Sequence, residues 1–492
     1  MKLSSPVPLI IGFDGTDLNK KLQQHLLKIN PVGIVLFKRN IVTLDQTREL
    51  IRQIRELLGQ IVVAIDHEGG LVNRFPDNCP VPPSPMSLYR SDDDQLLVAA
   101  CQMQAEVLAY LGINLNFAPV LDLAAGLINP AIGTRAFSDN PHDVARYGKI
   151  CVDVHREFSV GTCAKHFPGH GRSETDSHYA AGEVLVDEPT LWAEDLLPFR
   201  ELIVDEVPAV MLAHLIYPAL DPGNPAIFSR KIVTELLRNN LGFEGLTISD
   251  CVEMSAVGDA YHPSQIIQQG VSAGIDLFIS SFSLKKSLDF QLELKKTLEN
   301  VQPDQHRTVT QTGSPLQRLQ RFLKHSPGKP AEKSSLSMNA EQAVEMHRRT
   351  IDMQRKKSLP KEYRNFFLLE LSNNENGGIN ADEQRGLVAE QLLNSLERIQ
   401  QHQTVFDCDL SIVEQIIQEV NLSKLTLILI TANAFHRDLF SSFLQGLSKA
   451  ESAIHISMLD DRDLTGNLEN EWTPWGFNSW TATALARELL IL

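Results

Sequence analysis

Short apolar segments recur along the chain up to Ser280, and most of them end at a polar residue. Continuous apolar runs of this length are typical of parallel strands that are buried on both faces. Amphipathic stretches with helical spacing, such as 45–58 and 188–205, lie between most of these runs. The alternation predicts an α/β fold in which eight strand–helix units form an N-terminal (β/α)8, or TIM, barrel. The predicted strands are 9–15, 32–37, 61–66, 113–121, 161–166, 208–214, 246–250 and 275–280.

The composition changes at 325–339, where the sequence HSPGKPAEKSSLSMN is rich in Pro, Ser and Lys. Such a stretch predicts a linker or an exposed connection. Beyond it the alternation resumes, which predicts a smaller α/β domain with a parallel sheet. We therefore expect a catalytic barrel at 1–335 and a C-terminal domain at 336–492, whose role the sequence does not indicate. Its predicted strands are 366–371, 404–407, 425–431 and 454–459, and its predicted helices are 383–399, 410–420 and 437–447.

Polar residues stand at the ends of the predicted barrel strands. In this fold the active site forms at the carboxyl ends of the strands, so ionisable groups there favour an enzyme. Helix capping is the alternative role for one or two of them. The residues are Asp14, Lys38, Asp66, Asp122, Lys165, His166, His214, Asp250 and Ser280.

The densest polar segment is 165–178, KHFPGHGRSETDSH. Its Gly, Pro, Ser and Thr residues disfavour a helix and predict a loop that follows the fifth strand. Asp176 and His178 are two residues apart, so the carboxylate can hold the imidazole and raise its pKa toward the range of a general acid/base. A solvated Asp–His turn is an equally open interpretation of this spacing.

Other polar residues at the strand ends suggest sugar chemistry. Asp250 is a candidate nucleophile for an acetal carbon, although an N-cap role is also open. Asp66 begins the segment DHEGGLVNR, and a short carboxylate can accept paired hydrogen bonds from neighbouring sugar hydroxyls. Candidate donors to the same ring are Arg74, Arg135, Lys165 and His166.

Composition narrows the classes of partner. The chain has 61 acidic and 45 basic residues, a formal charge of −16, which disfavours binding to nucleic acid or to an anionic membrane. The sequence shows neither an export signal nor an apolar run of the ~20 residues that a membrane helix needs, so we expect a cytoplasmic protein. Six scattered cysteines and a histidine spacing unlike that of helical zinc motifs predict no metal and no other cofactor.

The pattern KHFPGHG followed by DSH resembles the β-N-acetylglucosaminidase branch of glycoside hydrolase family 3. The segments IDHEGGLVNRF, NFAPVLDL, IGTRAF, VMLAHLIYPALD and TISDCVEM support the resemblance. It implies a retaining hydrolase with Asp250 as nucleophile and with Asp176 and His178 as an acid/base dyad. The sugar-binding positions that it implies are Asp66, Arg74, Arg135, Lys165, His166 and His214.

The resemblance also implies a reaction and a substrate. Protonated His178 would protonate the leaving oxygen while Asp250 attacks the anomeric carbon, and neutral His178 would then activate water. Expected substrates are muropeptides and other peptidoglycan fragments with terminal GlcNAc, or chitooligosaccharides. A β-glucosidase, a glycoside phosphorylase and a sugar-binding protein without catalysis are the alternatives. The oligomeric state is not predicted.

Two residues depart from the usual pattern of the family, because His67 replaces Gln in D-Q-E-G-G and Cys251 replaces a second Asp after Asp250. A second domain without an export signal is a further departure. Four cations near the predicted mouth would make it less negative than the whole chain, which suits a substrate with acidic lactyl or peptide groups. They are Arg74, Arg135, Lys165 and Arg172.

Overall fold

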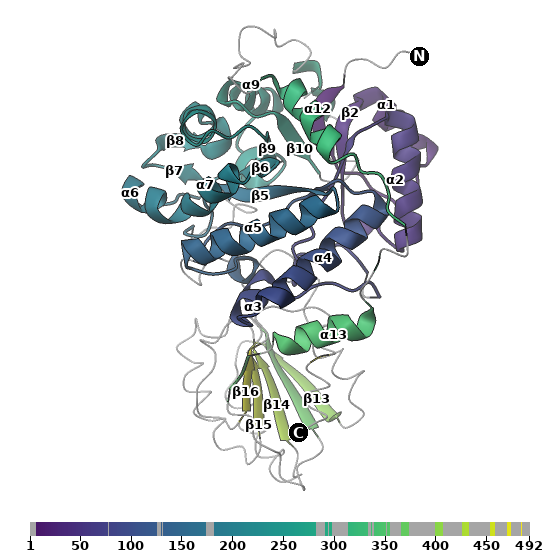
Figure 1. Ribbon diagram of the computed structural model, residues 1–492, viewed down its shortest axis with the longest axis vertical. Coiled ribbons are helices and arrows are strands. Elements are labelled where there is room, and N and C mark those ends of the chain that lie inside the picture. The colour runs from purple at the N-terminus through teal and green to yellow at the C-terminus, as the bar shows by residue number, and fades with distance from the viewer. Residues whose placement is uncertain are drawn as a thin grey trace. The chain divides into compact units, whose positions relative to one another are not determined.

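The structure is a computed structural model, shown in Figure 1. It describes residues 6–76, 78–124, 129, 131–173, 182–281, 291–293, 295–297, 313–332, 336, 339–350 and 484, and the backbone of six strands between 352 and 473. The chain forms two compact units. The first comprises Met1–Glu68, Val72–Cys79 and Leu97–Ser337, and the second comprises Gly69–Leu71, Pro80–Leu96 and Met338–Leu492. The boundary expected between residues 335 and 336 remains a prediction about independently folding domains.

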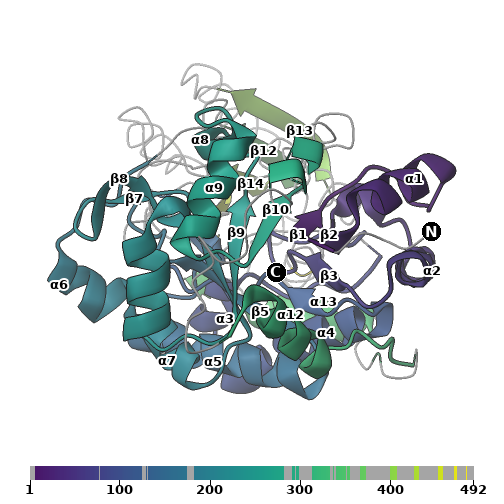
Figure 2. The same cartoon turned by 90° about the horizontal axis from the view of Figure 1, so that it is seen from above.

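A closed barrel of eight parallel strands forms the first unit, in the order β1-β10-β9-β6-β5-β4-β3-β2. Seen from above in Figure 2, helices surround these strands. All eight predicted strands are present, which confirms the barrel and the α/β class. The strands are β1 (Val7–Ile11), β2 (Pro31–Leu36), β3 (Val62–Ile65), β4 (Leu115–Asn116), β5 (Gly161–Phe167), β6 (Ala209–Leu212), β9 (Leu246–Cys251) and β10 (Leu277–Ser280).

The helices follow from amphipathic patterns and side-chain caps. The α2 helix begins after Thr43, whose side chain accepts a hydrogen bond from the Gln46 amide, and it buries Leu50, Ile51 and Ile54. The helix predicted at 188–205 is interrupted by a π-helical turn at Leu191–Asp195. No helix among the described residues is long and apolar enough to cross a membrane. The helices are α1 (Lys20–Ile29), α2 (Leu44–Leu58), α3 (Pro85–Arg90), α4 (Asp94–Leu111), α5 (Pro141–Glu157), α6 (Glu188–Thr190), α7 (Leu197–Val204), α8 (Ser255–Gly258), α9 (Pro263–Ala273), α12 (Pro315–His325) and α13 (Ala340–Arg349).

The amino-terminal end of the barrel contains a buried ion cluster. Asp276 immediately precedes β10 and accepts hydrogen bonds from Arg238 at 2.7 Å and from Arg318 at 2.6 and 2.9 Å. All three side chains are at most 3% exposed. Leu319 and Phe322 of α12 join the apolar core of the barrel. Protein side chains therefore fill this end, and we look for the active site at the opposite, carboxyl end of the barrel.

The segment predicted as an exposed connection is partly packed on the barrel. Asn114 donates to the carbonyl of Ser326 at 3.0 Å, and the amide of Ala331 donates to the carbonyl of Ala109 at 2.9 Å. Ser326 is only 5% exposed. The expectation of an exposed connection is thus wrong at Ser326 and Gly328, which are buried, whereas Lys329 and Pro330 are exposed as expected.

The second unit contains a six-stranded sheet in the order β11-β16-β15-β14-β12-β13. All neighbours are parallel except β11 and β16, so the predicted parallel sheet is present with an antiparallel edge. β13 begins at Ile399, five residues before its predicted start, so the last residue of the helix predicted at 383–399 is in a strand. Residues 383–398 and the helices predicted at 410–420 and 437–447 lie outside the described residues. The strands are β11 (Asp352–Gln354), β12 (Phe366–Ser372), β13 (Ile399–Phe406), β14 (Thr426–Thr431), β15 (Ala453–Ser457) and β16 (Asn470–Thr473).

Candidate active site

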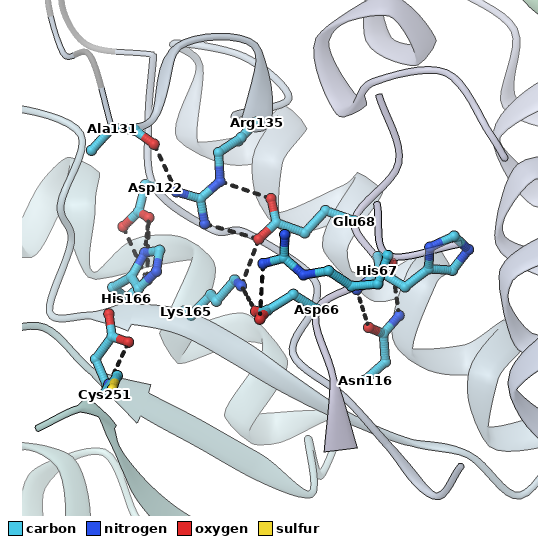
Figure 3. Close-up of polar contacts among 12 residues, drawn as sticks. Asp66, His67, Glu68, Asn116, Asp122, Ala131, Arg135, Lys165, His166 and Cys251 are labelled. Carbon is cyan, nitrogen blue, oxygen red and sulfur yellow. Dashed lines mark hydrogen bonds and ion pairs between the residues drawn. The ribbon is translucent and has the colours of Figure 1, made fainter. Parts of the chain in front are cut away.

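Two strand ends bring Lys165 of β5 against the carboxylates that follow β3. The Nζ atom of Lys165 lies 2.9 Å from Asp66 Oδ1 and 2.5 Å from Glu68 Oε1. Figure 3 shows the ammonium between the two carboxylates. The Lys165 side chain is 2% exposed, so its charge is compensated by protein groups rather than by water.

Arg135 and Arg74 extend this ion network. Arg135 binds Glu68 through two hydrogen bonds of 2.8 Å and also donates to the carbonyl of Ala131 at 2.6 Å. Arg74 lies 3.3 Å from Asp66 Oδ2. Three cations thus face two carboxylates, so the charges of these five side chains sum to +1. Three of the four cations predicted at the mouth therefore come together.

Burial and charge pairing act in opposite directions on the pKa values of these groups. Burial raises the pKa of Glu68, but Arg135 and Lys165 outweigh it and lower the value to about 2. Burial likewise opposes the charge of Asp66, yet Lys165 and Arg74 lower its pKa. Burial lowers the pKa of Lys165, but Glu68 and Asp66 more than compensate and the net change is upward. The whole network is therefore ionised at neutral pH.

The network separates into accessible and buried members. The side chains of Asp66, Arg74 and Arg135 are 19%, 13% and 11% exposed, whereas those of Lys165 and Glu68 are 2% and 1% exposed. The first three have edges available to a ligand, and the last two hold them in place. Sequence reasoning did not select Glu68, although it lies within the quoted DHEGG segment.

Asp122 organises a second group beside the network. Its carboxylate, fully buried after β4, accepts hydrogen bonds from the ring Nδ1 of His166 at 2.6 Å and from the amide of His170 at 2.6 Å. Burial raises the pKa of Asp122, but His166 outweighs it and lowers the value. A carboxylate acceptor requires the hydrogen of His166 on Nδ1, so its Nε2 is left for another partner. Asp122 was noted as a strand-end residue but not as a site residue.

Asp250 lies at the carboxyl end of β9, where its Oδ1 accepts a hydrogen bond of 2.6 Å from the amide of Cys251. Burial raises the pKa of Cys163 inside the barrel, and the charges of Asp66 and Asp250 both add to that shift. The two carboxylates therefore lie near the same interior thiol. His214, which follows β6, is 1% exposed.

Cys251 is unsuited to act as the nucleophile. Burial raises its pKa to about 12, so almost no thiolate exists at neutral pH. Its Sγ accepts a hydrogen bond of 3.0 Å from the hydroxyl of Ser281. The five described cysteines are all buried and none of them forms a disulfide.

Asp176 and His178 lie outside the described residues, as does everything from 174 to 181. The chain on either side of that segment is anchored. Arg172 pairs with Asp195 at 2.8 Å and with Glu194, while the amide of Ile216 donates to the carbonyl of Gly182 at 3.0 Å. Arg172 therefore has carboxylate partners on the π-helical turn rather than in the ion network. The described residues contain no group of His, Cys, Asp and Glu side chains arranged to hold a metal.

An eight-stranded parallel barrel with an ion network at the carboxyl ends of its strands defines a TIM-barrel enzyme. Residues 9–311 match the model of the glycosyl hydrolase family 3 N-terminal domain. The chain belongs to glycosyl hydrolase family 3 and is a glycoside hydrolase, which confirms the resemblance seen in the sequence.

Individual proteins that the chain resembles agree with this assignment. The chain is 37% identical over 279 residues to a β-hexosaminidase of Xylella fastidiosa, an alignment that covers 55% of this chain and 82% of the relative. It resembles in fold a family 3 β-N-acetylglucosaminidase of Paenibacillus, with a TM-score of 0.82, 23% identity and coverage of 98% and 95% of the two chains. NagZ of Neisseria gonorrhoeae in complex with N-trifluoroacetyl-D-glucosamine has a TM-score of 0.57 at 30% identity, over 69% of this chain and 95% of NagZ.

Proposed function

We propose that the protein is a retaining exo-β-N-acetylglucosaminidase that removes terminal β-linked GlcNAc. The observation that carries the proposal is the ion network around Lys165, which presents partly exposed Asp66, Arg74 and Arg135 at the same end of the barrel as Asp250. The β-hexosaminidase relatives and the NagZ complex with a GlcNAc analogue support the choice of sugar.

The proposed sugar site divides the work between two kinds of residue. Asp66 accepts hydrogen bonds from sugar hydroxyls. Arg74 and Arg135 donate hydrogen bonds to the oxygens of the sugar from fixed positions. Lys165 and Glu68 hold these groups rigidly, so little side-chain entropy is lost when the sugar binds. His166, oriented by Asp122, and His214 complete the set of proposed binding residues.

The proposed reaction has two steps that pass through a covalent glycosyl-enzyme. In the first, Asp250 Oδ attacks the anomeric carbon, the glycosidic bond breaks, and protonated His178 gives its proton to the leaving oxygen. In the second, neutral His178 takes a proton from water, which attacks the anomeric carbon and releases Asp250. Asp176 stabilises the imidazolium form of His178 between the steps.

The natural substrate that we propose is a cell-wall fragment or muropeptide with terminal GlcNAc. The partly exposed cations Arg74 and Arg135 suit an aglycone that carries a lactyl or peptide carboxylate, because they would attract its negative charge. A chitooligosaccharide lacks that charge and would gain nothing from it. The cytoplasmic location remains a prediction from the sequence.

Turnover of 4-nitrophenyl N-acetyl-β-glucosaminide by the wild type and two variants tests the proposal. We expect Asp250→Ala to lower kcat by at least about 10³-fold and His178→Ala by about 10²-fold or more. The matched control is Asp259→Ala, which removes an exposed carboxylate nine residues downstream and should leave kcat unchanged. Full turnover by Asp250→Ala would refute the mechanism. Preference for the corresponding glucoside, or dependence on phosphate, would instead indicate a glucosidase or a phosphorylase.

A further inference from the structure

The loop that carries Asp66 and Glu68 has a tip that belongs to the second compact unit. The Glu68 amide donates to the carbonyl of Val72 at 3.0 Å and closes the loop, and the tip between them is Gly69–Leu71. Gly69 and Gly70 have φ angles of +97° and +54°, which favour glycine. Gly69 is joined to Glu68 by a peptide bond, so the position of this tip affects where the Glu68 carboxylate lies.

The tip is packed tightly against the chain at 82–84. The Gly70 amide donates to the carbonyl of Pro82 at 2.9 Å. A Cβ atom on Gly69 would lie 2.5 Å from the carbonyl oxygen of Pro83, and one on Gly70 would lie 2.6 Å from the Cβ of Ser84. The glycine backbone thus lies so close to 82–84 that neither position has room for a side chain, and we expect a shift of 82–84 to move the tip as well.

Helix α13 contacts the chain at Val81, next to this segment, and at Asp93, nine residues beyond it. His347 Nε2 lies 2.9 Å from the carbonyl oxygen of Val81, and because a carbonyl only accepts, the ring donates. Arg349, at the end of the same helix, pairs with Asp93. Burial lowers the pKa of His347 to about 4, so the imidazole is neutral at neutral pH and keeps one N–H for this bond.

The helix itself is well defined for this role. Asn339 caps its amino terminus by accepting from the amide of Gln342 at 3.0 Å. Val344, Met346 and His347 form part of its buried face, with His347 1% exposed. A buried imidazole that donates to a loop carbonyl costs free energy to bury, and apolar side chains of similar size would pack without that cost. The hydrogen bond to Val81 thus accounts for a polar residue at this position.

We propose that α13 acts as a buttress of the active-site loop and that His347 is its positioning residue. The path runs from His347 to Val81, through 82–84 to Gly70, and along the chain to Glu68. It gives the C-terminal part of the chain a task in catalysis without a catalytic residue of its own. The inference rests on the proposed function only for the turnover experiment, because the exchange experiment needs no substrate.

Hydrogen–deuterium exchange of the full chain tests the buttress without any substrate. In His347→Ala, peptides that cover 66–75 should exchange at least about fivefold faster, because a lost hydrogen bond of average strength opens the segment by that factor. His347→Gln retains an N–H donor and should recover most of the protection. The matched control is Arg348→Ala on the same helix, whose ion pair with Glu345 stays within α13. Unchanged exchange at 66–75 in His347→Ala would overturn the proposal.

Turnover of 4-nitrophenyl N-acetyl-β-glucosaminide gives the second readout. We expect KM to rise about fivefold or more in His347→Ala while kcat changes less, because the loop holds binding groups rather than the nucleophile. If His347→Ala does not fold, Arg349→Ala serves as the second variant. It removes the exposed ion pair with Asp93 and should raise exchange at 66–75 about twofold. A wild type without turnover would refute the proposed function alone, since the exchange experiment still decides the buttress.

Discussion

Replacement of Glu68 by Gln tests whether the ion network is held together as described. Gln keeps the shape of the side chain but removes the charge that Arg135 and Lys165 both contact. The pKa of Glu68 falls from 4.5 to about 2 on folding, and at about 1.4 kcal/mol per unit this corresponds to about 3 kcal/mol. Loss of one partner from a buried ion pair costs a similar amount, about 3–5 kcal/mol. Because the folded-state pKa is depressed, this stabilisation is complete above the unfolded value and is lost as the pH falls toward 2.

Urea unfolding of the wild type and Glu68→Gln from about pH 7 down to about pH 3 measures the contribution of the Glu68 charge to the free energy of unfolding. We expect a difference of about 3 kcal/mol at neutral pH that narrows steadily below about pH 4.5. The matched control is Glu49→Gln, because Glu49 also pairs with an arginine through two hydrogen bonds but is solvent-exposed, and its loss should leave the unfolding free energy unchanged. A difference below about 1 kcal/mol at pH 7, or one that does not vary with pH, would refute the reasoning.

Three further predictions concern other groups of the barrel. Asp122→Asn removes the anionic acceptor that orients His166, so kcat/KM for the nitrophenyl substrate should fall about 10- to 100-fold with the fold intact by circular dichroism, and an unchanged value would contradict the assignment. Asp276→Asn leaves two buried arginines without their carboxylate, so urea unfolding should show a loss of about 3–5 kcal/mol with normal KM, and a raised KM would contradict a purely structural role. Burial raises the pKa of Cys251 to about 12, so iodoacetamide at pH 7 should not inactivate the native enzyme, and rapid inactivation with Cys251 modified would contradict its burial.

The barrel was predictable because each of its strands is a local apolar run that ends at a polar residue. Asp66, Lys165 and Asp250 could be selected as candidates for the same reason, since each stands at a strand end, while their roles remain predictions. Glu68 was missed because it lies beyond the strand, where the local pattern does not say which way a side chain points. Its importance arises from two cations contributed by distant segments, Lys165 and Arg135.

Long-range hydrogen bonds account for the other differences between expectation and structure. The composition of 325–339 is that of an exposed linker, yet Asn114, which is 212 residues from Ser326, binds its carbonyl. His347 likewise binds Val81 across 266 residues. Single backbone acceptors of this kind leave no trace in periodicity or composition, so only the folded structure reveals them.

The most direct test of the account is the anomeric configuration of the first product released from a cell-wall disaccharide with terminal β-linked GlcNAc. Proton NMR during the first minutes of the reaction distinguishes the two anomers before mutarotation mixes them. Two displacements at the anomeric carbon, by Asp250 and then by water, predict that β-GlcNAc appears first. Release of α-GlcNAc first, or no cleavage of the disaccharide, would contradict a retaining exo-β-N-acetylglucosaminidase.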